Sequence, residues 1–132
     1  MVKLDTHSNE LALVGRVLYS SLFVVYGYFK ITAFAGTTVY MGRQGLPAPA
    51  LFAALAVLFE LGGGLLLLAG YQTRLVALSL AVYVIVAILI AHRNWADANQ
   101  LAHFWKGVTI AGGGFALAAL GGGSYSLDGR RG

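Results

Sequence analysis

Glu60 is the only charged side chain in a long apolar segment, so the sequence has to provide something that stabilises it. The segment "LFELGGGLLLLAG" runs from Leu58 to Gly70, and no other charged residue occurs between Ala48 and Ala69. An apolar stretch of about 20 residues is long enough to cross a bilayer. An ionised and unpaired carboxylate costs roughly 2.5 to 3.5 kcal/mol or more at the centre of the bilayer. We therefore expect a basic partner for Glu60, or a carboxyl group that stays neutral.

Arg16, in the preceding apolar segment, is the best candidate for this partner. At about 1.5 Å per residue, it lies roughly 7 Å from Glu60 in depth, against about 12 Å for Lys30. Residues spaced by three or four positions share one helical face, and five residues of this segment do so: Arg16, Ser20, Phe23, Gly27 and Lys30. We predict a buried pair of Arg16 and Glu60. The pair either fixes the register of two helices or acts as a proton-linked, ligand-binding acid.

A second group of polar and aromatic side chains falls near the opposite ends of the apolar segments. Its members form a candidate ligand pocket for a small anion or a quinone headgroup: Tyr26, Lys30, His92, His103 and Lys106. Residues of these types at span ends more commonly anchor helices at the membrane interface. His92 and His103 with Asp97 match no metal-ligand spacing, so we predict no metal site. We assign no catalytic residue.

The composition identifies an integral membrane protein. Of 132 residues, 58% are hydrophobic and 11% are charged, and the mean hydropathy is +0.75. Soluble domains carry about 25% charged residues, and a chain this short cannot bury so much apolar surface in one core. Lipid is therefore the expected solvent for the rest of that surface.

The basic residues and the missing cysteines exclude several functions. The nine Lys and Arg residues are scattered near the ends of apolar runs, which is typical of membrane topology signals and not of nucleic-acid binding. The absence of cysteine excludes a dithiol active site, a thiolate-ligated iron–sulfur cluster and a covalently attached c-type haem.

Four segments are long enough to span the membrane, and they predict an all-α, four-transmembrane-helix bundle in a single domain over residues 1–132. The expected spans are about 11–34, 48–69, 74–92 and 101–121. "GGGLLLLAG" in the second span resembles "GGGFALAALG" in the fourth. This similarity could reflect two helical hairpins in direct repeat, or the small residues that recur at helix contacts in any membrane bundle.

The distribution of basic residues favours one orientation. With four spans, both termini share a side with the "GYQTR" turn, and that side holds five basic residues against four on the other. Because cytoplasmic loops carry an excess of Lys and Arg, we expect both termini in the cytoplasm.

Several stretches together resemble the DoxX family, over about residues 11–128. They are "VGRVLYSSLFVVYGYFKI", "YMGRQGLPAP", "FELGGGLLLLAGYQTR", "AHRNW", "FWKGVTIAGGG" and "GGGSYSLD". The resemblance implies a small, multi-pass protein of the bacterial cytoplasmic (inner) membrane. It places six residues on the family's recurrent polar positions: Arg16, Lys30, Glu60, His92, Lys106 and Asp128. Relatives of this kind include a subunit associated with thiosulfate:quinone oxidoreductase and membrane partners of stress-response enzymes.

Three functions remain open from the sequence. The first is a redox- or stress-linked membrane subunit that binds a quinone or a small anion, and quinone is the one cofactor we consider. Since the chain has no redox motif of its own, electrons would come through that quinone or a partner redox enzyme. The second is a non-enzymatic anchor or assembly partner of another complex, or of its own copies, through glycine-rich faces. The third is a small oligomeric transporter with Glu60 as the coupling acid.

Overall fold

In residues 3–131, which the computed structural model describes, the chain is built from helices and contains no strand. A short 3₁₀ turn (η1, Asp5–His7) leads into the first long helix, α1 (Ser8–Thr32). A ten-residue helix, α2 (Phe34–Arg43), follows almost directly.

The second long rod consists of three consecutive helical pieces. These are α3 (Pro49–Val57), a π-helical turn (η2, Leu58–Gly62) and α4 (Gly63–Ala69). Pro49 begins α3, where its missing N–H and fixed φ suit the first turn of a helix. Gly70 ends α4 with a φ of 75°, a left-handed conformation that glycine adopts without steric cost.

The remaining long helices form a hairpin. They are α5 (Thr73–Ala91) and α6 (Ala98–Leu120), and a short helix, α7 (Leu127–Arg131), completes the described chain. Asp97 caps α6, because its carboxylate accepts hydrogen bonds from the backbone N–H groups of Asn99 and Gln100 at 2.8 and 3.4 Å. This pattern satisfies donors that the first turn of a helix leaves unpaired.

Among residues 3–131, three helical segments are long and apolar enough to cross a membrane. They are Asp5–Thr32, Pro49–Ala69 and Thr73–Ala91, with mean hydropathies of 1.4, 2.3 and 2.6. With 23 residues α6 is long enough, but its composition keeps it out of this group, because its first turns carry polar residues and Lys106 and its middle carries three glycines. The prediction of an all-α membrane protein is therefore confirmed.

The segment expected to link the first two spans is largely helical and forms α2. Ala33 interrupts the helical conformation between α1 and α2, with φ −115° and ψ 45°. The hydroxyl of Thr37, in α2, donates to the carbonyl oxygen of Ala33 at 3.0 Å. The first long helix therefore ends at Thr32, slightly before the predicted end of the first span at residue 34.

The long helices pack through small residues and a compact apolar core. The core contains Phe23 of α1, Leu67 of α4, Ala111 of α6 and four residues of α5: Ala77, Leu80, Val84 and Ile88. Gly107 lies directly against Ile88, and Gly114 lies against Ala81, so α5 and α6 approach closely along their length. Small residues allow such close contacts between membrane helices.

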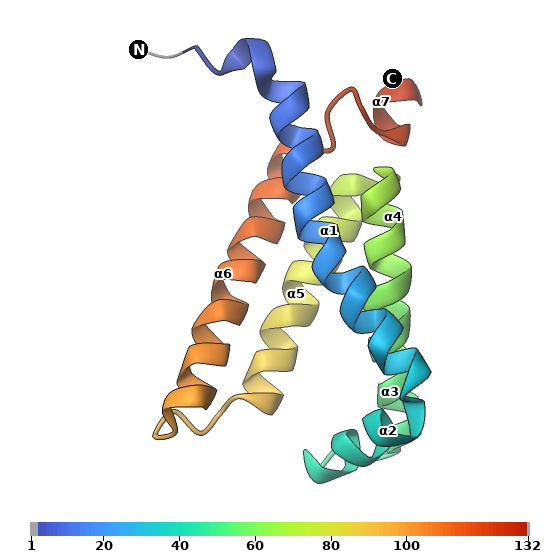
Figure 1. Ribbon diagram of the computed structural model, residues 1–132, viewed down its shortest axis with the longest axis vertical. Helices are drawn as coiled ribbons and strands as arrows, with labels where there is room; N and C mark the ends of the chain where they lie inside the picture. The colour runs from blue at the N-terminus through green and yellow to red at the C-terminus, as the bar shows by residue number, and fades with distance from the viewer. Residues whose placement is uncertain (1–2, 132) are drawn as a thin grey trace.

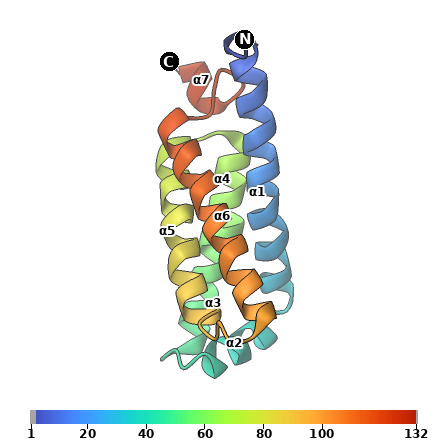
Figure 2. The same ribbon diagram turned by 90° about the vertical axis from the view of Figure 1, so that its left-hand side faces the viewer.

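The two ends of the bundle carry different elements. Both termini, α7 and the turn between α4 and α5 lie at one end, and α2 and the loop between α5 and α6 lie at the other (Figure 1). A view turned by 90° shows the same arrangement, with the long helices side by side (Figure 2). Residues near the end of α1 can therefore meet residues of α2, α3 and the end of α5.

Candidate functional site

Glu60 is paired with Lys30. The Lys30 Nζ atom lies 2.8 Å from Glu60 Oε2 and donates a hydrogen bond to Oε1 at 3.1 Å. The two side chains are only 26% and 12% exposed. The expectation that Glu60 needs a basic partner is met, but the predicted partner, Arg16, is wrong.

Two glycines set the helix register that selects Lys30. A Cβ atom on Gly27 would lie 2.5 Å from the backbone N of Leu61, and one on Gly64 would lie 2.9 Å from the backbone N of Val24. The backbones of α1 and the second rod thus touch, and Lys30, one turn after Gly27, lies level with Glu60. Counting residues from the edges of the apolar segments could not reveal this register, because it depends on which backbones meet.

Arg16 instead binds the C-terminal segment at the opposite end of the bundle. It is 2% exposed, and it lies about 21 Å from Lys30 along α1. Its Nη1 atom donates to the carbonyl oxygen of Gly122 and its Nη2 atom to that of Tyr125, both at 2.7 Å. Arg16 therefore ties the segment after α6 to the first half of α1.

Asp128 secures the same C-terminal segment to the turn before α5. Its carboxylate oxygens accept hydrogen bonds from the backbone N–H groups of Gln72 and Thr73 at 2.8 and 2.7 Å. Its own backbone N–H donates to the carbonyl oxygen of Gly70 at 3.0 Å. The Ser-Leu-Asp element thus caps α5 from a distant part of the chain.

The Lys30–Glu60 pair lines a cavity of about 390 Å³ between α3, η2 and α5. Its other polar lining comes from Tyr40, Gln44, Tyr83 and His92. Apolar side chains make up most of the wall, among them Phe52, Leu55, Phe59, Val86 and Ile90. Pockets of about 300 to 1,000 Å³ with apolar walls and a few convergent polar groups are typical small-molecule sites.

The local backbone at Glu60 is unusual. Glu60 is the central residue of the π-helical turn η2, which interrupts an otherwise continuous rod of α3 and α4. π-Bulges within α-helices are rare and occur frequently at functional sites. The turn also contributes to an aromatic pair. The ring of Phe59, in η2, stacks on that of Tyr83, in α5, with centroids 5.3 Å apart and an interplanar angle of 4°.

The residues of the predicted ligand pocket divide into two groups. Lys30 and His92 line the cavity. Tyr26 lies under Lys30, with the ammonium 5.6 Å from the ring centroid, and is 52% exposed. His103 stacks on His92 at 5.1 Å, and His92 Nδ1 lies 2.8 Å from Gln100 Oε1. Tyr26, His103 and Lys106 are not part of the cavity wall.

Sequence reasoning missed three polar residues of the cavity: Tyr40, Gln44 and Tyr83. Tyr83 could have been found by the same reasoning as Glu60, because it places a polar hydroxyl group in the middle of an apolar span. Tyr40 and Gln44 carry no such signal, because they lie between the predicted spans, where polar side chains are common. Among the described residues, no group of three or more His, Asp or Glu side chains is arranged to hold a metal ion.

A bundle of apolar helices with an ion pair beside an internal cavity defines a small α-helical integral membrane protein. The model of the family described as DoxX matches residues 11–93. Two relatives come from Escherichia coli (strain K12). Inner membrane protein YqjF is 41% identical over 116 residues, which are 88% of this chain and 88% of that protein. Inner membrane protein YphA is 35% identical over 125 residues, 91% of this chain and 89% of that one.

The chain belongs to the DoxX family, and its relatives are inner membrane proteins. No solved structure matches it significantly.

Proposed function

We propose that the protein binds a quinone through the Lys30–Glu60 pair and serves as a membrane subunit of a redox- or stress-linked system. The observation that carries the proposal is a charged pair on the wall of a mostly apolar cavity of about 390 Å³. The cavity offers both kinds of surface that a quinone headgroup requires, since the flat ring is apolar and its oxygens accept hydrogen bonds.

Each member of the pair has a distinct role in this proposal. The Lys30 ammonium donates to a ring oxygen of the oxidised headgroup. The Glu60 carboxylate accepts a hydrogen bond from a hydroxyl of the reduced headgroup. A quinone supplies two-electron redox chemistry that the chain itself does not encode, so a partner redox enzyme is the source of electrons. In this proposal the protein is therefore a quinone-binding subunit and not a stand-alone enzyme.

An apolar tail has a path next to the headgroup cavity. A second cavity of about 500 Å³ is lined by six residues of η2 and α5: Phe59, Leu78, Ser79, Val82, Tyr83 and Val86. Three of them, Phe59, Tyr83 and Val86, also line the Lys30–Glu60 cavity. The shared aromatic wall favours a headgroup with a tail over a small anion.

The proposal includes a fourth membrane span and an orientation. With 23 residues, α6 is about 34 Å long, comparable to the roughly 30 Å hydrocarbon core. It runs beside α5, and both termini lie at one end of the bundle, as an even number of spans requires (Figure 1). We propose two helical hairpins, α1 with the second rod and α5 with α6, and cytoplasmic termini.

Quinone binding is tested with the purified protein in lipid nanodiscs, using a short-tail ubiquinone as the probe. Thermal unfolding and mass spectrometry of the retained quinone are measured for wild type, K30M, E60Q and the control K106M. Lys106 is a basic residue in the first half of α6 and does not line the cavity. We expect quinone to stabilise wild type and K106M and to have little effect on K30M and E60Q. Equal stabilisation of all four proteins, or stabilisation by sodium thiosulfate in place of quinone, would overturn the assignment.

A further inference from the structure

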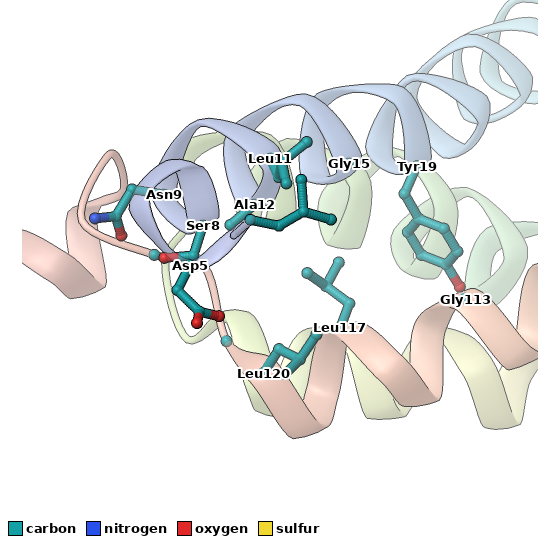
Figure 3. Close-up of a pocket in the computed structure, with 13 residues that line it drawn as sticks. Asp5, Ser8, Asn9, Leu11, Ala12, Gly15, Tyr19, Gly113, Leu117 and Leu120 are labelled. Atoms are coloured by element: carbon teal, nitrogen blue, oxygen red, sulfur yellow. The ribbon is translucent and has the colours of Figure 1, made fainter. Parts of the chain in front are cut away.

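A second, separate groove lies between α1 and α6 at the end of the bundle that carries the termini. Its volume is about 600 Å³, and it shares no lining residue with the Lys30–Glu60 cavity. Figure 3 shows the apolar side chains that face it, with Leu11 and Ala12 on α1 opposite Leu117 and Leu120 on α6. The two helices contact each other far less than α5 and α6 do.

The two ends of the groove differ in polarity. At the inner end the Tyr19 side chain crosses from α1 to α6, and its ring lies against Gly113 and Gly114 (Figure 3). At the outer end the Asp5 side chain of η1 points into the mouth of the groove, beside Ser8 (Figure 3). Among residues 3–130, whose side chains the structure describes, the Asp5 carboxylate has no hydrogen bond or ion pair, and no residue that lines the groove is cationic. The groove is therefore apolar inside and acidic at its mouth.

The dimensions of the groove match a lipid chain better than a whole protein helix. Its lining extends over roughly 12 Å of α6 and roughly 20 Å of η1 and α1 together, at about 1.5 Å per residue. A volume of about 600 Å³ over these lengths corresponds to a mean cross-section of roughly 30 to 50 Å². A helix with side chains is 10–12 Å wide and needs about 80 to 110 Å². An alkyl chain at van der Waals contact needs roughly 20 Å², so the width of the groove suits one or two alkyl chains.

We propose that this groove binds a phospholipid whose headgroup carries an ammonium, with an acyl chain between α1 and α6 and the ammonium at Asp5. The apolar walls replace the contacts that the chain makes in the bilayer. The acidic mouth selects the headgroup, because the exposed Asp5 carboxylate attracts a cation and disfavours an anion. Phosphatidylethanolamine has this chemistry, whereas phosphatidylglycerol has the same chains without an ammonium.

The test is native mass spectrometry of the full chain released from mild detergent containing equal amounts of phosphatidylethanolamine and phosphatidylglycerol with identical acyl chains. Wild type is expected to retain one phosphatidylethanolamine in preference to phosphatidylglycerol. D5N removes the charge and leaves the groove open, so it is expected to retain both lipids equally. We expect wild type to retain phosphatidylethanolamine about fivefold more than phosphatidylglycerol, which corresponds to the free energy of one exposed ion pair.

Filling the groove supplies an independent test. Gly15 lines the groove, and a Cβ atom there would meet no atom within 4 Å, so G15L extends a side chain from an open position into the groove. G112L is the matched control, because Gly112 is equally open and is not a lining residue. We expect G15L to lose the retained lipid and G112L to keep it. Lipid retention by G15L equal to wild type, or a dimer in wild type that G15L disrupts, would overturn the proposal.

Discussion

Gly27 of α1 and the backbone of Leu61 in η2 are in direct contact, so no side chain fits between them. A Cβ atom on Gly27 would lie 2.5 Å from the Leu61 N atom and 2.8 Å from its Cα atom. Because both are backbone atoms, a substituent cannot be accommodated by a rotamer change, and the helices have to separate. This contact holds Lys30 level with Glu60.

Replacing Gly27 with alanine is therefore expected to destabilise the protein, although alanine normally favours a helix. Overpacking of a tight contact costs about 1 to 3 kcal/mol, which exceeds the gain of about 0.5 to 1 kcal/mol in helix propensity. Thermal unfolding in mild detergent measures the effect. The control is G15A, which gains the propensity without a clash, because Gly15 has open space. A G27A protein as stable as G15A would contradict the backbone contact.

The Lys30–Glu60 pair is expected to show strong energetic coupling. Removing one partner leaves the other charge in a largely desolvated site, and breaking a buried pair in this way costs up to about 3 to 5 kcal/mol. Since Lys30 is 26% exposed, we expect K30M and E60Q each to fall below that range. The double variant should lose less than the sum of the two, with a coupling energy of roughly 1 to 3 kcal/mol.

A double-mutant cycle by denaturant unfolding in detergent measures this coupling. Combining E60Q with R16M serves as the comparison cycle, because Arg16 binds the C-terminal segment and not Glu60. We expect the effects of E60Q and R16M to be additive within about 0.5 kcal/mol. Coupling between Arg16 and Glu60 as strong as that between Lys30 and Glu60 would restore the pairing expected from the sequence.

Arg16 is expected to control whether the C-terminal segment stays docked. Its two hydrogen bonds reach different carbonyl groups, a geometry that the guanidinium fork supports and a lysine cannot reproduce. Each hydrogen bond of a charged group contributes about 1.5 to 3 kcal/mol, so R16K should release residues 122–131. Limited digestion with carboxypeptidase detects the release as faster trimming of the C-terminus. R74K is the control, because Arg74 donates a single hydrogen bond, to the carbonyl oxygen of Ala119, at an exposed position.

Asp128 is expected to act together with Arg16 on the same segment. D128N weakens the cap on the Gln72 and Thr73 N–H groups, at a cost of about 1 kcal/mol. Once R16K has released the segment, the cap is already lost, so D128N should add little in that background. Unfolding of the two single variants and the double variant measures the non-additivity. Fully additive losses would show that the two residues stabilise the fold independently.

The sequence alone could predict what each polar group needs, but not which groups meet. An acid in an apolar span requires a basic partner, and this rule correctly predicted that Glu60 has one. The choice of Lys30 over Arg16 depends on the backbone contact at Gly27, and single glycines give no sign of the helix that they face. The role of Arg16 depends on a chain reversal after Leu120 that returns Tyr125 to α1, and long-range contacts of this kind leave no periodic signal.

The sequence predicted the long helices but not the local changes in backbone conformation. Composition and length were enough to predict apolar helices, because hydropathy is a sum over many residues. The π-helical turn at Glu60 and the helix α2 depend on the backbone conformation of a few residues, such as the break at Ala33. The candidate ligand cavity depends on both, so the sequence placed Lys30 and His92 in a pocket but missed Tyr40, Gln44 and Tyr83.

Filling the Lys30–Glu60 cavity is expected to remove quinone binding while both charges stay in place. Ala87 lines the cavity on α5, and A87L adds three carbon atoms to a wall that faces the proposed headgroup. The control, A102L, introduces the same side chain at an exposed position of α6 that is not part of the cavity. Titration with a short-tail ubiquinone, followed by thermal unfolding, should give an affinity for A87L at least about tenfold lower, or 1.4 kcal/mol. A102L should bind like wild type. An A87L protein with unchanged affinity would place the quinone elsewhere, whatever the effects of K30M and E60Q.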